Sequence, residues 1–286
     1  MAIYHLSAKP VQRSQGRSAT AAAAYRSGSK IKDQRDGRTH DYRPRRGVDY
    51  TALVGWSSDR ESLWNEAELA ERRKDATTAR EYEVAIPQEL SGEMSIRLVK
   101  GFALLLHHEY GVAVDVAIHD FDTSNPHAHV MATTRPVVDG GLSSKKASIE
   151  WSDKKRKQEN LGKRKDELEE IRASWAEMCN YALEMEGFEE RIDHRSYERQ
   201  GLECIPGRHL GHAVTALLRR GEYSWRADAE RQRQAEAEAE REKAEQEQAL
   251  QSQASEVMTT AARLAAFDAA NAPPPEADDT DEVRPS

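Results

Sequence analysis

Two neighbouring apolar runs constrain the fold of this chain more than any other feature. The runs are "VAVDVAIHDFD" (112–122) and "HAHVMATTRPVV" (127–138), both rich in β-branched residues and separated only by "TSNP". Such runs are typical of strands, and a short connection made of turn-forming residues joins antiparallel neighbours. The sequence therefore predicts an antiparallel hairpin over residues 112–138.

The segments around this hairpin predict further strands and helices without a regular alternation. Residues 2–9 and 80–87 are typical of strands, and helices are expected at 18–28, 58–78, 91–111 and 166–187. The first helix has Ser18 as an N-cap and Gly28 as a stop. This pattern predicts an α+β fold, an α/β sandwich in which helices flank a central antiparallel sheet.

The charge of the chain is distributed unevenly. The net charge is −8, but residues 226–286 hold seven Lys/Arg against fifteen Asp/Glu, and residues 1–225 hold 35 of each. Within the latter part, residues 1–50 carry eleven Lys/Arg against four Asp/Glu, a basic arm that suits a phosphate-bearing partner. We expect a folded domain over 1–225 and an acidic tail over 226–286, helical at first and then disordered.

Several function classes are excluded by what the sequence lacks. It has no run of about 18 apolar residues and no apolar segment at the N-terminus, so we expect no membrane insertion and a cytoplasmic location. The two cysteines, Cys179 and Cys204, lack the spacing of a metal site and are expected to be free thiols.

Three histidines in and beside the predicted hairpin suggest a metal site. His127 and His129 are two residues apart on one strand and share a face, and pairing across the hairpin can place His119 beside them. Three imidazoles with open coordination positions suit zinc, manganese and other transition metals better than magnesium. Glu81 and Glu83 share a face of another strand and are candidates for a ligand or for a partner of a histidine. The alternative is a set of partly buried histidines bonded to the backbone.

Several motifs, in order, resemble the MobA/MobL-type plasmid mobilisation relaxases of the HUH endonuclease superfamily. They are "AIYHLSAKPVQRSQGRSATAAAAYRSG", "EYEVAIP", "NPHAHVMATTR" and "IDHRSYERQGLECIPGRHLG", and together they span roughly residues 1–222. The superfamily is named for two histidines that flank a hydrophobic residue, which here are His127 and His129 around Ala128. The resemblance leaves the acidic tail outside.

The resemblance implies a nickase that cuts one DNA strand at a plasmid transfer origin to start conjugative mobilisation. It implies Tyr25 as the nucleophile that becomes joined to the 5′ phosphate, and His119, His127 and His129 as ligands of a metal. The residues alone would make Tyr25 a packing side chain on an alanine-rich helix, with Tyr4 as the first substitute nucleophile. A tyrosine hydroxyl, with a pKa of about 10, is a weak nucleophile at neutral pH and needs such help. The expected cofactor is a divalent metal, manganese or magnesium, with zinc as an alternative.

Other positions follow from the same resemblance. Glu83, and after it Glu81, match acids near the family's site. The expected partners are single-stranded DNA at a transfer origin, accessory mobilisation proteins and the coupling protein of a type IV secretion system, with export into a recipient cell. Basic residues around the first helix and on the histidine strand are expected to contact DNA: Lys9, Arg13, Arg17, Arg26 and Arg135.

Two other functions remain open at this point. A rolling-circle replication initiator uses the same tyrosine and histidine chemistry, although Tyr25 precedes the histidines here, as in relaxases. A non-catalytic DNA-binding adaptor would use the histidines to hold a structural metal. Nicking of single-stranded DNA separates the adaptor from both enzymes.

Overall fold

The computed structural model describes residues 4–121, 123, 125–201, 214, 220–243 and 246. Close contacts divide the chain into two compact units, Met1–His194 and Arg195–Ser286. The boundary expected from the sequence lies later, at residue 225, and it stays a prediction.

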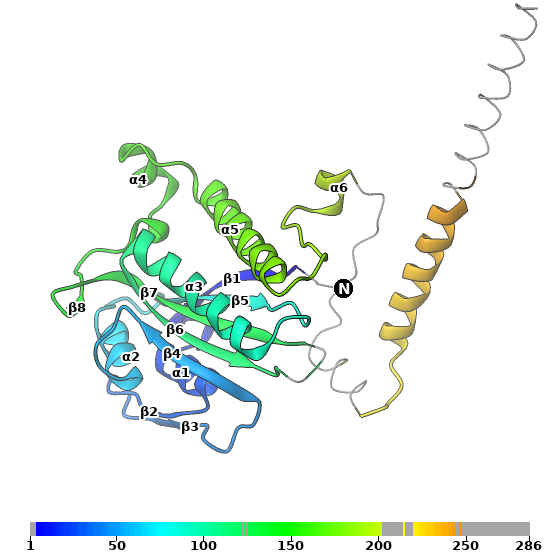
Figure 1. Cartoon of the computed structure of the whole chain (residues 1–286). Coiled ribbons are helices and arrows are strands. Elements are labelled where there is room, and N and C mark those ends of the chain that lie inside the picture. The colour runs from blue at the N-terminus through cyan, green and yellow to red at the C-terminus, as the bar shows by residue number, and fades with distance from the viewer. Residues whose placement is uncertain are drawn as a thin grey trace, which may run out of the picture. The chain divides into compact units, whose positions relative to one another are not determined.

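The first unit contains all the strands that the structure describes. Figure 1 shows its elements, which in chain order are β1 (Leu6–Gln12), η1 (Arg13–Gln15), α1 (Ala19–Ser27), β2 (Lys30–Lys32), β3 (Thr39–Asp41), β4 (Val48–Val54), α2 (Arg60–Leu69), β5 (Thr77–Ala85), α3 (Gly92–Tyr110), β6 (Val112–His119), β7 (His127–Val138), β8 (Gly141–Leu142), η2 (Ser148–Glu150), α4 (Asp153–Gln158) and α5 (Arg164–Met185).

The main sheet has the order β1-β5-β7-β6-β4, and β8 pairs with β7. Every pair is antiparallel, and β6 and β7 form the hairpin that the sequence predicts, with His119 opposite His127. The second sheet is the short β2-β3 pair. The α+β fold with a central antiparallel sheet is therefore confirmed.

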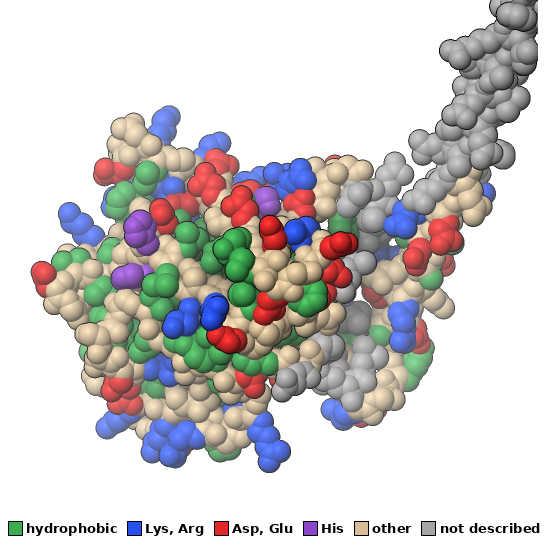
Figure 2. Space-filling view, in the orientation of Figure 1, with side chains coloured by type: hydrophobic (Ala, Val, Ile, Leu, Met, Phe, Trp, Pro, Cys, Tyr) green, Lys and Arg blue, Asp and Glu red, His purple; other side chains and the backbone are tan. Residues whose placement is uncertain are grey.

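The two faces of the main sheet pack against different helices (Figure 1). Val114, Ile118 and Val130 belong to the core under α3 and α5, where Phe102 and Trp175 are fully buried. The alternate residues of the same strands face α1 and α2, where they form a second, smaller core. The buried members of this core include Val11, Trp64, Ala79, Ala113 and Met131. On the face seen in Figure 2, Lys/Arg and Asp/Glu side chains are interspersed.

Helix α1 is short and lies against the sheet through small side chains. Ser18 accepts a hydrogen bond from the backbone N–H of Ala21, as the predicted N-cap should. Gly28 ends the helix at a φ of 58°, a left-handed conformation that favours glycine. The side chains that face the sheet and α2 are almost all methyl groups: Ala19, Thr20, Ala22, Ala23 and Ala24 are buried.

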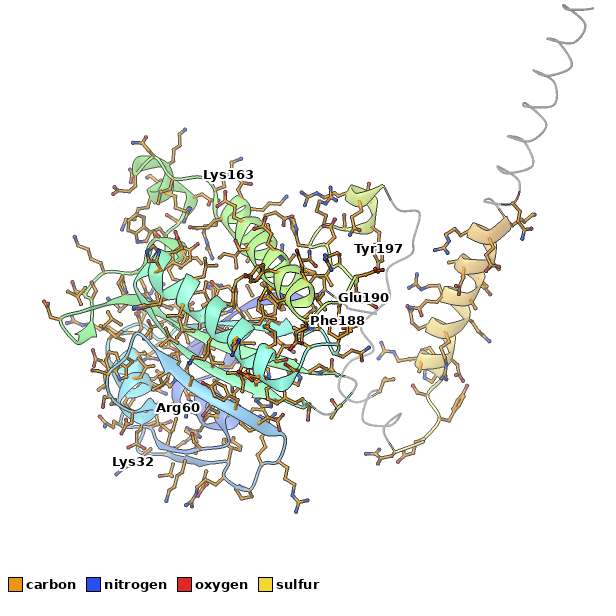
Figure 3. The ribbon with its side chains drawn as sticks, in the orientation of Figure 1. Lys32, Arg60, Lys163, Phe188, Glu190 and Tyr197 are labelled. Carbon is orange, nitrogen blue, oxygen red and sulfur yellow. The ribbon has the colours of Figure 1, made fainter. Side chains whose placement is uncertain are left out.

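Helix α2 begins with a buried ion pair. Asp59 caps it, and Arg60, labelled in Figure 3, donates from Nε to both carboxylate oxygens of Asp115 at 3.0 and 2.8 Å. Trp64 also donates to Asp115, at 2.8 Å. These contacts join α2 to the middle of β6.

Three expectations about the elements need correction. The helix expected over 58–78 ends at Leu69, because residues 77–85 form β5. No element was expected at the positions of β2, β3 and β4. The charged residues of this segment hide the alternation of apolar and polar residues that is typical of a strand. The polar connector expected over 140–165 contains the short helix α4.

The second unit contributes one short helix, α6 (Tyr197–Gln200), and a helix over 225–243. The latter agrees with the helical start expected for the acidic tail. The part expected to be disordered, 271–286, lies outside the described residues. No helix in the described ranges is long and apolar enough to cross a membrane.

Candidate functional site

Three histidine side chains meet on the sheet face that carries α1. His119 ends β6 opposite His127, the first residue of β7, and His129 follows on the same strand. The ring centres lie 5.3 Å apart for His119 and His127, 5.2 Å for His119 and His129, and 5.3 Å for His127 and His129. The structure thus brings together the three histidines that the sequence singles out.

In two of these rings, the hydrogen bond shows which ring nitrogen is left for another ligand. His127 Nδ1 lies 2.9 Å from the carbonyl oxygen of Asn125, and His129 Nδ1 lies 2.9 Å from Glu81 Oε1. Because both oxygens are acceptors, Nδ1 is the donor in each ring. A neutral ring then has its lone pair at Nε2, which is the usual state of a metal ligand.

His119 is bonded at both nitrogens. Its Nε2 lies 2.8 Å from the carbonyl oxygen of Arg26, and its Nδ1 lies 3.3 Å from a guanidinium nitrogen of Arg45. Burial, followed by the nearby charges of His129 and Arg45, lowers the pKa of His119 to about 3. Burial also lowers the pKa of His129. Both rings are therefore neutral at pH 7.

The donor chemistry of the cluster suits a metal, but its conformation is not that of an assembled site. In the ranges that the structure covers, no group of three His, Cys, Asp or Glu side chains is placed to hold a metal ion. In His127 and His129 the hydrogen bond is at Nδ1, so Nε2 is the nitrogen left for a metal. His119 would first have to exchange its bond to the Arg26 carbonyl for the metal.

Glu81 is the buried acid behind the histidines. It is 1% exposed and accepts hydrogen bonds from His129, from Arg17 at 3.2 Å and from Arg26, whose Nη2 lies 2.6 Å away. Burial acts to raise its pKa, but the hydrogen bonds from His129 and Arg26 outweigh burial and lower the pKa to about 2. Glu81 is therefore a carboxylate that orients His129.

Glu83 lies farther from this network than the sequence suggests. It is opposite His129 in the β5–β7 register, but its carboxylate accepts from Lys9 at 2.8 Å and is one-third exposed. In the structure Glu81 rather than Glu83 bonds to a histidine, and the expected place of Glu83 near the site stays a prediction.

Tyr25 lies in the last turn of α1, on the side opposite the buried alanines. Its side chain is 46% exposed, and the ring of Tyr42 packs edge-on against it at 5.2 Å. The next residue, Arg26, provides the carbonyl that bonds to His119. The end of α1 that carries Tyr25 is therefore fixed to the histidine cluster. Tyr4, the substitute considered from sequence, belongs to the core under α3 and α5, on the other face of the sheet, and burial raises its pKa.

Arg45 is a site residue that the sequence analysis does not identify. Its guanidinium carbon lies 3.9 Å from the centre of the Tyr25 ring, and Nη1 donates to the Tyr25 carbonyl at 2.5 Å. Nη2 of the same side chain reaches His119. Arg45 thus contacts both the candidate nucleophile and the histidine cluster. The only trace of it in the sequence is the basic run "RPRRG" (43–47).

Most of the cations expected to contact DNA already have partners within the protein. The guanidinium of Arg13 is bonded to Glu68 and to the carbonyl of Glu71 and is 11% exposed. Arg26 is bonded to Glu81 and is 15% exposed. Lys9 and Arg17 also form ion pairs but are half and one-third exposed. The DNA contacts of all four stay predictions.

The structure does not bring Arg135 to the histidines. Arg135 is six residues from His129 on β7, a separation of about 20 Å along a strand. It bonds to Glu71 at 2.7 Å and to the carbonyl of Ser143 at 3.2 Å, and it is 14% exposed. A contact with a phosphate held at the histidine cluster is therefore excluded for Arg135 by its position.

The motif "DHRSYERQG" (193–201) contains His194 and helix α6. His194 packs against Tyr4 with ring centres 6.5 Å apart and lies 3.7 Å from Glu169. His209 and His212 lie outside the described residues. The geometry assigns no catalytic role to this motif.

Comparisons with known proteins agree with this architecture. The chain is 40% identical over 264 residues to the mobilisation protein MobL of Acidithiobacillus ferridurans, covering 81% of this chain and 68% of that protein. It is 33% identical over 246 residues to the conjugal transfer protein TraA of Agrobacterium fabrum, covering 78% of this chain. The chain spans only 22% of the length of that TraA protein.

A solved structure described as the molecular basis of vancomycin resistance transfer in Staphylococcus aureus is also similar. It matches with a TM-score of 0.58 and 32% identity, over 68% of this chain and 100% of that chain. The family model of the MobA/MobL family matches residues 17–220, a range that includes Tyr25 and all three histidines. The chain therefore belongs to the MobA/MobL family, the plasmid mobilisation relaxases that its motifs resemble.

Proposed function

We propose that this chain nicks one strand of DNA at a plasmid transfer origin by tyrosine transesterification, with Tyr25 as the nucleophile. The observation that carries the proposal is that one side chain, Arg45, contacts both the Tyr25 ring, 3.9 Å from its centre, and His119, at 3.3 Å. These contacts keep an exposed tyrosine beside the cluster of three imidazoles. Family membership and the names of the relatives, which refer to mobilisation and conjugal transfer, support the same reaction class.

The proposed step conserves the number of phosphate ester bonds. The Tyr25 oxygen attacks the scissile phosphorus and loses its proton, and the bond between phosphorus and the 3′ oxygen breaks. The 3′ oxygen takes up a proton and leaves as a hydroxyl, while the 5′ phosphate stays joined to Tyr25. Because an ester replaces an ester, the reverse attack by a 3′ hydroxyl can rejoin the strand without another energy source.

His119, His127 and His129 are the residues that would hold a divalent metal. When bound, such an ion would polarise the scissile phosphate and neutralise charge that develops on its oxygens. Glu81 would keep His129 in the tautomer that presents Nε2, and the carbonyl of Asn125 would do the same for His127. The all-imidazole donor set favours manganese or zinc over magnesium.

Arg45 supplies a fixed positive charge beside the attacking residue. A guanidinium 3.9 Å from the Tyr25 ring centre orients that ring and favours negative charge nearby. Its second contact, to His119, ties its position to the same cluster. We therefore assign Arg45 the role of positioning Tyr25.

Family membership also helps to choose between the alternative functions and suggests the partners of this chain. Membership of a mobilisation family favours transfer over rolling-circle replication as the purpose of the nick. We assign nicking and DNA binding to residues 1–225. Single-stranded DNA at the transfer origin is the proposed substrate, and accessory mobilisation proteins and a type IV secretion coupling protein are the proposed partners.

A nicking assay on the full chain tests the proposal. Single-stranded oligonucleotides tiled across the DNA that flanks the gene are labelled at their 3′ ends and incubated with the protein and manganese. The expected product is a protein that carries label through denaturing electrophoresis, at one position in the tiling. If DNA is bound but neither cut nor linked to the protein at any position, the chain is a binding adaptor and the proposal is wrong.

A further inference from the structure

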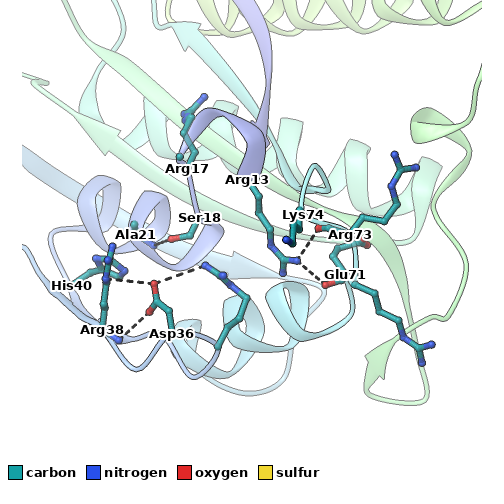
Figure 4. Close-up of a pocket in the computed structure, with 13 residues that line it drawn as sticks. Arg13, Arg17, Ser18, Ala21, Asp36, Arg38, His40, Glu71, Arg73 and Lys74 are labelled. Carbon is teal, nitrogen blue, oxygen red and sulfur yellow. Dashed lines mark hydrogen bonds and ion pairs between the residues drawn. The ribbon is translucent and has the colours of Figure 1, made fainter.

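A cavity of about 620 Å³ lies beside the N-terminal half of α1, and none of the three clustered histidines lines it (Figure 4). Its walls come from the segment before α1, the β2–β3 turn and the segment that follows α2. Seven lysine and arginine side chains line it, against the two carboxylates of Asp36 and Glu71. Its volume falls within the range of roughly 300–1,000 Å³ that is usual for small-ligand pockets. The cavity is therefore large enough for a nucleotide unit, and its charge favours an anion.

The N-terminus of α1 is not what makes this cavity attractive to an anion. The buried carboxylate of Glu68 already accepts from the backbone N–H of Ala19 at 2.7 Å, and Ser18 accepts from Ala21. Glu68 also pairs with Arg13 at 2.8 Å and with Arg35 at 3.4 Å. The helix end is thus satisfied from within, and a ligand would be recognised by side chains.

Two of the lining cations are exposed and have no partner in the described ranges of the chain. Arg72 and Lys74 form no hydrogen bond or ion pair with any described residue, whereas Arg73 between them pairs with Asp75 at 2.6 Å. His40 lines the same cavity, and its Nε2 atom is buried without a hydrogen-bond partner among the residues that the structure describes. The cavity therefore contains hydrogen-bond donors that form no bond with the described part of the protein.

The cavity opens on the same face of α1 as the candidate nucleophile. Ala21 lines the cavity, and Tyr25 is four residues later in the same helix. Residues four apart in a helix are neighbours on one face, with Cβ atoms about 5–6 Å apart. The cavity and the candidate nucleophile therefore lie next to one another along α1.

We propose that this cavity binds a backbone phosphate of the single DNA strand, next to the phosphate that is cut. The inference rests on the proposed function and adds a second site that holds the DNA strand. Arg72 and Lys74 bind the phosphodiester, and the cavity sets which phosphate of the strand reaches Tyr25. Contacts of this kind fix position and carry no base sequence information.

The salt dependence of binding tests whether the cavity takes a phosphate. Affinity of the full chain for the tiled single-stranded oligonucleotides is measured against salt for three proteins: the wild type, Arg72→Gln/Lys74→Gln and Lys100→Gln/Lys165→Gln. The last pair is exposed on α3 and α5, has no partner in the described part of the chain, and loses the same charge. Each lost phosphate contact should lower the slope of log affinity against log salt by about 0.7 for the cavity variant only. Equal slopes in the cavity variant and the wild type, or an equal fall in the control, would overturn the inference.

A second measurement locates the phosphate. On the oligonucleotide that binds best, single phosphates are replaced in turn by uncharged methylphosphonate. The wild type and the control should lose affinity at one or two positions beside the nick site, and the cavity variant should show no further loss there, because the two changes remove the same contact. Identical losses in all three proteins would mean that no strand phosphate enters the cavity.

Nicking is scored on the same oligonucleotides, so that the two proposals fail separately. If the strand is cut and linked to Tyr25 while the cavity variant behaves like the wild type, the nickase proposal stands and the cavity proposal falls. If the slope and the methylphosphonate pattern change but no strand is cut, the cavity binds DNA and the nickase proposal falls.

Discussion

The guanidinium of Arg45 lies 3.9 Å from the centre of the Tyr25 ring, and the same side chain reaches His119 at 3.3 Å. These contacts join a loop, a helix and a strand that are far apart in the sequence. Arg45 comes from the loop after β3, Tyr25 from α1 and His119 from the end of β6. The position of the tyrosine ring therefore depends on a residue outside both motifs that carry the family resemblance at the site.

Arg45→Gln should slow formation of the protein–DNA adduct by about 100-fold, comparable to the loss of one donor that stabilises a transition state. The rate is measured at saturating DNA, and affinity is measured separately, because a positioning residue acts on the rate. Arg45→Lys should recover part of the rate by restoring the charge. Arg46→Gln is the matched control, since Arg46 is exposed and has no partner among the described residues. Equal effects of Arg45→Gln and Arg46→Gln would remove the assigned role.

Tyr25→Phe should abolish the adduct and leave affinity for single-stranded DNA nearly unchanged, because the hydroxyl is the proposed attacking group and contributes little to binding. Adduct is followed by the label retained on the protein in denaturing electrophoresis. Tyr42→Phe is the control: its ring is 5.2 Å from that of Tyr25, and its adduct should persist. Adduct that survives in Tyr25→Phe and disappears in Tyr42→Phe would make Tyr42 the nucleophile.

Removal of metal should stop nicking and leave the fold intact. His127→Ala and treatment of the wild type with a chelator should each lower the nicking rate by at least about 100-fold, since the ion carries much of the charge stabilisation. Calorimetric titration with manganese should show binding to the wild type and weaker binding to the variant. Full nicking in chelator would refute the metal, and unfolding in chelator would support a structural metal instead.

A chain that stops after Arg226 should still bind and nick DNA. All residues assigned to catalysis lie within Met1–His194, a unit with its own core, and the removed part carries a net negative charge that repels DNA. Affinity for single-stranded DNA should therefore be unchanged or slightly higher. Loss of nicking by a truncated chain with a normal circular dichroism spectrum would place part of the active domain beyond residue 226.

Arg60→Gln should lower the free energy of unfolding by on the order of 3 kcal/mol, because it leaves the buried carboxylate of Asp115 without its counter-charge. Urea unfolding followed by tryptophan fluorescence measures the loss. Arg97→Gln, which breaks an exposed pair with Glu93, should change stability little. Adding Asp115→Asn to Arg60→Gln should recover part of the loss. Without that recovery, packing of the Arg60 side chain rather than charge would explain the effect.

The hairpin and the shared face of the three histidines could be predicted from the sequence, because both follow from the two-residue repeat of a β-strand. His119, His127 and His129 share a face once β6 and β7 pair, and their facing rings follow from the register. The expected ends of α1 were also right, because Ser18 and Gly28 have the residue types that start and stop a helix. These features depend on neighbours in the chain, which a sequence displays directly.

The remaining parts of the site depend on contacts between distant segments. Glu81 and Glu83 share a strand face, and only the structure shows that Lys9 pairs with Glu83 while Glu81 reaches His129. Arg45 lies in a loop, where no period fixes the direction of a side chain. The partners of Arg13 and Arg135 illustrate the same limit, because a basic residue in the sequence does not reveal the acid that it pairs with, such as Glu68 for Arg13.

The small side chains on the buried face of helix α1 set the distance between this helix and the sheet. Because its buried residues are four alanines and one threonine, helix α1 packs closer to the layer beneath than a helix with larger buried side chains could, and the position of Tyr25 relative to the histidines follows from that spacing. A larger side chain at Ala23 would lift α1 and the Tyr25 hydroxyl with it, while leaving His127 and His129 in place. The reach of the proposed nucleophile is thus set by side chains that take no part in the proposed chemistry, and their small size is itself a functional property.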